Sequence, residues 1–350
     1  MAQGKRAAQK TEGDVLTGLI SFFGVSGSES GVRKYIEQQI RPYVDEISVD
    51  RMGNLVARKR GKGPKVMLAA HMDEIGLMVK RMEERGFIYC TAIGGIDPAA
   101  FVGNPVHLAA PKGRIHGFLT THEVSAGKYI QKVPTIEDIF IDTGLTRTQL
   151  QQRGVEIGTY VHLESHTCCE GEGGIVLGKA LDNRIGCYIL IELAKALQRP
   201  KADVYFVFTV QEEFGMFGAR TSAFQLDPDW GIAVDTTYAN DVFADPSRSI
   251  GKGPVITVKD GEFIANPCVV GWLKATARKQ KIPFQLEATE SGTTDASTIQ
   301  TVRGGVPTGA LSIAVRNIHT TSGLARMGDI RDAVRLLAAL LRDPPKVCPV

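Results

Sequence analysis

The chain has 350 residues, of which 43% are hydrophobic and 23% are charged, and these proportions are ordinary for a soluble globular protein. The length is enough for two domains, and the net charge of +3 gives no reason to expect binding to nucleic acid or to an anionic membrane. No apolar stretch approaches the roughly 20 residues of a membrane-spanning helix, and residues 1–14 hold no apolar signal-peptide core. Since the six cysteines are scattered and suggest no disulfide framework, we expect a cytoplasmic, reduced protein.

The N-terminal part of the chain, after a short polar leader at 1–13, predicts the beginning of an α/β domain. Its patterns indicate, in chain order, a helix at 15–23, a helix that Ser28 or Ser30 would cap, a hairpin of 47–49 with 55–58, and a buried strand at 66–70. An uninterrupted apolar run of this kind is typical of a parallel strand that is covered on both faces.

From about residue 74 to residue 177 the sequence pattern differs from that of the flanking parts. Helical periodicity disappears, and glycine and proline separate short β-like pieces. These pieces lie at 75–79, 87–92, 105–108, 114–119 and 160–163. We therefore predict a small β-rich domain, residues 74–177, inserted into a discontinuous α/β domain formed by residues 1–73 and 178–350.

Strand and helix patterns alternate again after residue 177. Helices are predicted at 183–197, 267–280 and 330–341, and strands at 204–210, 232–235 and 310–315. Such alternation favours a three-layer α/β/α sandwich.

Histidine and carboxylate residues follow or end the apolar runs of the α/β part. Ligands of open α/β sheets bind in the crevice beyond the carboxyl ends of the strands, where buried carboxylates are costly unless something pairs with them. Convergence of such side chains on one crevice calls for metal ions. The residues concerned are His71, Asp73, Asp182, Glu212, Glu213, Asp235 and His319.

Five of these residues can be divided between two divalent ions. One ion would take His71, Asp182 and Asp235, and the other would take Asp182, Glu213 and His319. The shared aspartate would bridge ions that lie about 3.5–4 Å apart. Each ion then has three protein ligands and room for a shared water, as a catalytic site requires.

Glu212 and Asp73 are predicted to act without binding metal. Adjacent residues of an extended chain point to opposite sides, so Glu213 would bind metal while Glu212 faces the reacting water as general base. Asp73 would accept the second ring proton of His71 and fix its tautomer. Taken singly, each signal also fits an ordinary structural role: two solvated glutamates, a structural His-x-Asp pair, and, for Asp182, a helix N-cap.

A second metal site is weakly indicated in the β-rich part. The residues His162, His166, Cys168 and Cys169 resemble a zinc ligand set, but adjacent cysteines rarely both bind one zinc. The sequence contains no P-loop, no His-Glu-x-x-His and no Gly-x-Ser-x-Gly motif. A serine or cysteine nucleophile stays open at this stage.

Several segments, taken together and in order, resemble the tetrahedral aminopeptidases, a family of dinuclear metallopeptidases also called glutamyl or deblocking aminopeptidases. The most specific are Ala-His-Met-Asp-Glu-Ile-Gly at 70–76, Gly-Lys-Ala-Leu-Asp-Asn-Arg at 178–184 and Val-Gln-Glu-Glu-Phe-Gly at 210–215. Further matching segments lie at 95–98, 136–142, 233–237, 294–296, 305–309 and 316–319. The resemblance covers residues 15 to 340.

The resemblance implies a three-layer α/β/α zinc-peptidase domain with an inserted, β-barrel-like dimerisation domain. It implies two divalent ions per subunit, Zn²⁺ or Co²⁺, on the five ligands given above, with Glu212 as general base for a metal-bound hydroxide. The expected reaction is release of N-terminal residues from peptides, by dimers that assemble into a tetrahedral dodecamer.

The chain departs from the family pattern in three places, one of which is the stretch 120–132, where the expected pattern is missing. After His319 the family usually has Ser-Pro-x-Glu, where this chain has Thr-Thr-Ser-Gly at 320–323, and Ser-Gly-Thr stands at 291–293 in place of a glycine-rich segment. A two-metal carboxypeptidase or amide deacylase is the alternative enzyme. The missing glutamate also keeps open a catalytically impaired, metal-binding assembly subunit.

Overall fold

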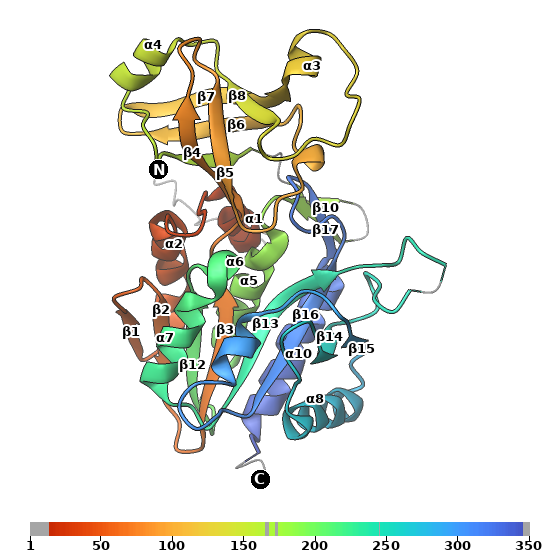
Figure 1. Cartoon of the computed structure of the whole chain (residues 1–350). Helices are drawn as coiled ribbons and strands as arrows, with labels where there is room; N and C mark the ends of the chain where they lie inside the picture. The colour runs from red at the N-terminus through yellow and green to blue at the C-terminus, as the bar shows by residue number, and fades with distance from the viewer. Residues whose placement is uncertain (1–13, 165–167, 172–173, 245, 346–350) are drawn as a thin grey trace, which may run out of the picture.

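The computed structural model describes residues 14–164, 168–171, 174–244 and 246–345. An eight-stranded mixed sheet forms the middle layer of its larger part (Figure 1). From one edge to the other, the strands are β1 (Glu46–Val49), β2 (Leu55–Lys59), β12 (Asp203–Thr209), β3 (Lys65–His71), β13 (Trp230–Tyr238), β16 (Thr308–Val315), β14 (Val255–Lys259) and β15 (Gln285–Ala288). The four central strands β12, β3, β13 and β16 are parallel, so their carboxyl ends meet at one edge of the sheet.

Helices cover both faces of this sheet, which confirms the predicted three-layer α/β/α architecture. One face carries α1 (Asp14–Ser21), α2 (Ser30–Ile40), α5 (Leu181–Ala196), α8 (Pro267–Gln280) and α10 (Met327–Arg342). The other face carries α7 (Phe217–Leu226) and α9 (Asp295–Ile299), with the short α6 (Glu212–Gly215) before α7. Within the described residues, no helix combines the length and apolarity needed to cross a membrane.

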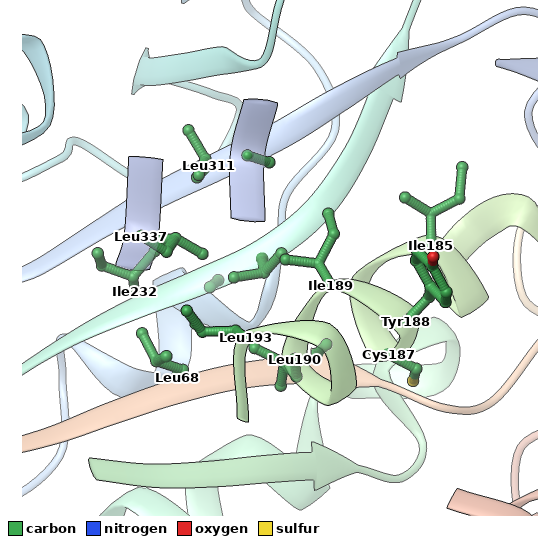
Figure 2. Close-up of a cluster of buried hydrophobic side chains, with 14 of the residues drawn as sticks. Leu68, Ile185, Cys187, Tyr188, Ile189, Leu190, Leu193, Ile232, Leu311 and Leu337 are labelled. Carbon is green, nitrogen blue, oxygen red and sulfur yellow. The ribbon is translucent and has the colours of Figure 1, made fainter. Parts of the chain in front are cut away.

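The core is centred on α5, whose residues are buried around nearly the whole helix. Figure 2 shows Ile189 and Leu193 of this helix among Leu68 of β3, Ile232 of β13 and Leu337 of α10. Each fully buried aliphatic side chain of this kind contributes about 1.5–3 kcal/mol through the removal of apolar surface from water. This packing holds the N-terminus of α5 at the carboxyl edge of the sheet.

The β-rich part forms a closed barrel with a hydrophobic core of its own. Its strands, in barrel order, are β4 (Gly76–Met82), β5 (Ile88–Ile93), β8 (Ile139–Asp142), β7 (Gly113–Thr121), β6 (Pro105–Ala110) and β9 (Tyr160–Leu163). The short helices are η1 (Arg41–Tyr43) before β1, and η2 (Pro98–Ala100), α3 (His122–Ser125) and α4 (Arg147–Gln152) among the barrel strands. The barrel stands over the edge toward which β3 points (Figure 1).

A three-stranded antiparallel sheet lies where the chain returns from the barrel. It consists of β10 (Cys168–Gly171), β11 (Ile175–Gly178) and β17 (Gly323–Arg326). The sequence patterns did not predict these strands, nor β8, β14 and β15, all of which are only four or five residues long.

Two local predictions are wrong. Residue Glu29 stands at the N-cap of α2 without a side-chain cap, so neither Ser28 nor Ser30 caps it. Strand β13 does not end at Asp235 but continues to Tyr238, because Thr236 and Thr237 pair on with β16.

Candidate metal centre

The five side chains named as metal ligands lie together at the carboxyl edge of the sheet. They form two groups that share one residue, and in each group the three candidate ligand atoms lie within 4.8 Å of one another. The groups are His71 with Asp182 and Asp235, and Asp182 with Glu213 and His319. They come from the end of β3, the start of α5, the middle of β13, the start of α6 and the loop after β16.

Asp182 occupies the centre of this arrangement. Its Oδ1 lies 3.3 Å from Nε2 of His71, and its Oδ2 lies 3.2 Å from Nε2 of His319. On the outer sides, Oδ1 of Asp235 is 3.5 Å from Nε2 of His71, and Oε1 of Glu213 is 3.2 Å from Nε2 of His319. The two oxygens of one carboxylate therefore face two different histidines, which is the geometry of a bridging ligand.

The electrostatics of the site favour bound cations. Burial alone would lower the pKa of His319, but the carboxylates of Asp182 and Glu213 raise it to about 11. Burial raises the pKa of Asp235 to about 6. Oε1 of Glu213 is buried and, although it lies 3.2 Å from Nε2 of His319, it makes no hydrogen bond of acceptable geometry among the described residues. Imidazole nitrogens and carboxylate oxygens are ligands for zinc and other divalent ions, so the residues present fit such ions.

The backbone at the start of α5 turns Asp182 toward the site. Asp182 and Asn183 have non-helical dihedral angles, and Ala180 is in the left-handed region. The side chain of Asn183 accepts a hydrogen bond from the amide of Gly186 and donates one to the carbonyl of Val234 in β13. Asn183 thus serves as the helix cap, and the carboxylate of Asp182 is left available to the two histidines.

The two glutamates do not follow the extended-chain argument that the sequence suggested. Gln211 is left-handed, and Glu212 and Glu213 open the helical turn α6. Asp73 holds this turn, because its Oδ1 accepts from the amide of Glu212 at 3.1 Å and its Oδ2 accepts from the amide of Glu213 at 3.2 Å. Both glutamates still reach the centre, and Oε2 of Glu212 lies 3.9 Å from Nε2 of His71.

Asp73 lies close to His71, but its carboxylate is better placed for another task. Its Oδ1 is 3.5 Å from Nδ1 of His71, whereas the backbone carbonyl of Asp73 is 3.3 Å from the same nitrogen. The carboxylate also accepts a 2.6 Å hydrogen bond from the hydroxyl of Ser26. Asp73 therefore acts chiefly as a positioning residue for the turn that carries Glu212 and Glu213.

Sequence reasoning gave no role to two glycines that lie against the centre. A Cβ at Gly95 would lie 2.8 Å from Nδ1 of His319, and one at Gly94 would lie 3.1 Å from Oε2 of Glu213. These glycines follow barrel strand β5, so only the folded chain brings them to the ligands. The sequence signals were the Gly-Gly pair and, for Gly95, its place in the matching segment 95–98.

Asp295 is a further buried carboxylate near the centre, and its part in a matching segment was the only sequence signal. Burial raises its pKa to about 7, and its Oδ2 accepts a 2.6 Å hydrogen bond from the hydroxyl of Thr209. A further buried acidic side chain thus lies beside the five candidate ligands.

The weakly indicated second zinc site gains no support from the described residues. His162 stacks near His107 and Phe23, with ring centroids 5.0 and 5.1 Å away, and it belongs to neither described group of metal-ligating side chains. His166, and the side chains of Cys168 and Cys169, lie outside the described residues.

The fold is an α/β/α sandwich, and two histidine–carboxylate groups that share Asp182 lie at the carboxyl edge of its parallel strands. This combination is typical of metallohydrolases. Comparison with known proteins specifies it further: the chain belongs to the M42 glutamyl aminopeptidase family, whose model matches residues 53–336. The predicted resemblance is therefore confirmed. M42 peptidases are metallopeptidases, and membership supports an aminopeptidase function for this chain.

Individual relatives are similar to this chain over nearly its whole length. The lysyl aminopeptidase of Pyrococcus furiosus is 34% identical over 339 residues, which are 94% of this chain and 96% of the relative. An aminopeptidase of Desulfurococcus kamchatkensis has a similar structure, with a TM-score of 0.90 and 32% identity over 95% of this chain and 94% of that one. The TET1 peptidase of Pyrococcus horikoshii, which can assemble into a tetrahedron or a large octahedral shell, has a TM-score of 0.86 and 28% identity over 95% and 100% of the two chains.

Proposed function

We propose that this chain is a two-metal aminopeptidase that removes N-terminal residues from peptides. The position of Asp182 between His71 and His319 is the observation that carries the proposal. Asp235 and Glu213 would complete two sets of three ligands, for Zn²⁺ or Co²⁺. When bound, such ions supply Lewis-acid stabilisation of developing negative charge and a nucleophile at neutral pH.

Glu212 is the residue we assign to proton transfer. It lies at the edge of the centre and belongs to neither ligand group, yet its Oε2 is within 3.9 Å of His71. Burial, reinforced by the charges of Asp235 and Glu213, raises the pKa of Glu212 well above its ordinary value. A carboxylate of raised pKa can take a proton from the attacking water and deliver it to the leaving amine.

The substitution Glu212→Gln tests this assignment. It should leave metal content per chain unchanged and lower kcat by about 10²–10⁴-fold on aminoacyl chromogenic substrates, the usual contribution of a general base. Glu213→Gln is the matched comparison, since it should lose metal as well as turnover. A fully active Glu212→Gln variant would refute the role.

The alternatives predict different results in the same assays. A carboxypeptidase or amide deacylase would hydrolyse N-acyl amino acids and leave substrates with a free N-terminal amine intact. A catalytically impaired assembly subunit would hydrolyse neither class after loading with zinc, cobalt or manganese.

We also propose a cytoplasmic homo-oligomer, with the barrel as its dimerisation domain and a dodecamer as the final assembly. The tetrahedral shell of the Pyrococcus horikoshii relative supports this. So do exposed apolar side chains in the loop between α3 and β8 of the barrel part, where Tyr129 is 89% and Val133 76% accessible. Mass photometry should give about twelve times the chain mass of 37.9 kDa, and a monomer would exclude the assembly.

A further inference from the structure

The pocket at the metal centre continues to a second group of buried charges. Its cavity volume is about 340 Å³, and it is lined by metal-ligand candidates such as His71 and also by Arg248, Asp260 and Glu287. These three charged side chains come from the segments around β14 and β15, and none of them contacts the metal ligands in an ion pair between described residues.

The second group, Arg248, Asp260 and Glu287, lies within reach of one long side chain from the candidate metal ligands. Asp235 and Thr237 are two residues apart on β13, so their side chains share a face and their Cα atoms are separated by roughly 6.6 Å. The hydroxyl of Thr237 donates a 2.7 Å hydrogen bond to Oε1 of Glu287. A substrate whose scissile bond is at the metal centre could therefore reach this group with its first side chain.

Two of the three charges neutralise each other. Nη1 of Arg248 donates to Oε1 of Glu287, and the hydroxyl of Thr257 donates to its Oε2 at 2.9 Å. With the bond from Thr237, both carboxylate oxygens of Glu287 are satisfied. Nε of Arg248 is also buried without a hydrogen-bond partner among the described residues, but Glu287 cancels the positive charge that would attract a substrate carboxylate.

Asp260 is the charge that remains uncompensated. The side chain is only 5% exposed, and its Oδ1 accepts from the amides of Glu262 and Phe263 at 2.9 and 2.7 Å. Its Oδ2 is buried and has no hydrogen-bond partner in the part of the chain that the structure describes. The nearby cation Lys259 is engaged by backbone carbonyls and by Glu290. Burying a carboxylate oxygen without a partner is costly, so this side of the pocket favours a bound cationic hydrogen-bond donor.

We propose that Asp260 binds the positively charged side chain of an N-terminal lysine or arginine, which makes basic residues the preferred substrates. This inference rests on the proposed aminopeptidase function. Since Arg248 cancels Glu287, the far wall of the pocket carries a net negative charge that favours a cation and disfavours a glutamyl side chain.

The substitution Asp260→Asn tests the proposal without removing the turn that Asp260 supports. Asparagine keeps an Oδ1 that can accept from the two amides, but it removes the negative charge at Oδ2. The wild-type protein should show higher kcat/KM for lysyl and arginyl than for leucyl or glutamyl chromogenic substrates. In Asp260→Asn the ratio of lysyl to leucyl kcat/KM should fall about 10- to 100-fold, in line with a lost hydrogen bond between charged groups. Glu262→Gln, which alters an exposed carboxylate two residues away, should leave the ratio unchanged.

The outcomes separate this inference from the proposed function. Efficient cleavage of leucyl or glutamyl substrates with rejection of lysyl ones would overturn the specificity and leave the aminopeptidase intact. An equal loss on all substrates in Asp260→Asn would show a purely structural role and also overturn it. If no substrate is cleaved, the proposed function fails, and calorimetry with lysinamide and leucinamide decides the inference. Tighter binding of lysinamide that Asp260→Asn abolishes would support it, and equal binding of the two amides would overturn it.

Discussion

Gly95 offers the sharpest test of how the barrel contributes to the metal centre. The substitution Gly95→Ala would place a Cβ 2.8 Å from Nδ1 and 3.1 Å from Cε1 of His319, where ordinary contact begins near 3.4 Å. The imidazole must therefore move by about 0.6 Å, the difference between 3.4 and 2.8 Å. Metal–ligand distances tolerate only about 0.2 Å. The ion assigned to Asp182, Glu213 and His319 should lose much of its affinity, while the one assigned to His71 and Asp235 stays.

Disturbing the support of a metal ligand typically costs 10- to 100-fold in metal affinity or activity, and we expect a loss in this range. Elemental analysis after dialysis against a weak chelator should show metal content falling from two toward one per chain, with a parallel loss of turnover. Gly271→Ala is the matched control, because it lies in α8 and its Cβ would meet no atom within 4 Å. Two ions bound at wild-type affinity in Gly95→Ala would refute the reasoning.

Two further predictions concern stability. Burial lowers the pKa of His107 and of His162 to about 4, below the ordinary 6.5, so between these values the unfolded chain binds more protons than the folded one. The free energy of unfolding should therefore fall as pH drops from 6.5 toward 4, by up to about 1.4 kcal/mol per pH unit for each histidine. Urea unfolding should show this, and the double substitution to glutamine should flatten the profile; an unchanged slope would contradict it. Lys179→Met removes one of the two cations that pair with buried Glu74 and leaves Arg184, 3.6 Å away, as the other, so it should cost about 1.5–3 kcal/mol, the value of a hydrogen bond to a charged group. A loss below about 1 kcal/mol, the value of an exposed pair, would show that the pair is not isolated from water.

The architecture of the α/β part could be predicted because each of its main strands and helices carries a clear hydrophobic pattern along its length. The buried runs that became β3, β12, β13 and β16 are continuous and apolar, and the helices between them are periodic. The sequence patterns alone did not predict barrel closure, which was expected only from the family resemblance, because closure depends on pairings such as β5 with β8, and β8 is a short strand that lacks a distinct pattern.

The candidate ligands could be named because parallel strands bring their carboxyl ends to one edge. This argument needs only that a residue lie near a strand end, so it tolerated the error that Asp235 ends its strand, whereas Asp182 was named at the start of a helix. It could not give the details. The helical turn at Glu212 depends on a left-handed Gln211, and the role of Asp73 depends on two backbone amides that no side-chain pattern encodes. Asp260 went unnoticed for a similar reason, because an aspartate in a turn is common and its unpartnered oxygen is visible only in the fold.

The position of the barrel in the chain links it to the candidate metal centre, whatever its part in the proposed assembly. The chain leaves the sheet at His71, passes through the barrel, and returns to the centre at Asp182, so candidate ligands of the first ion flank the insertion on both sides. The barrel also returns Gly95 to the face of His319. At its entry, Glu74 accepts from the amide of Gly24 and pairs with Lys179 near its exit. The entry and exit of the barrel are thus tied together beside the ligands, and a subunit contact that shifts the barrel would shift metal ligands with it.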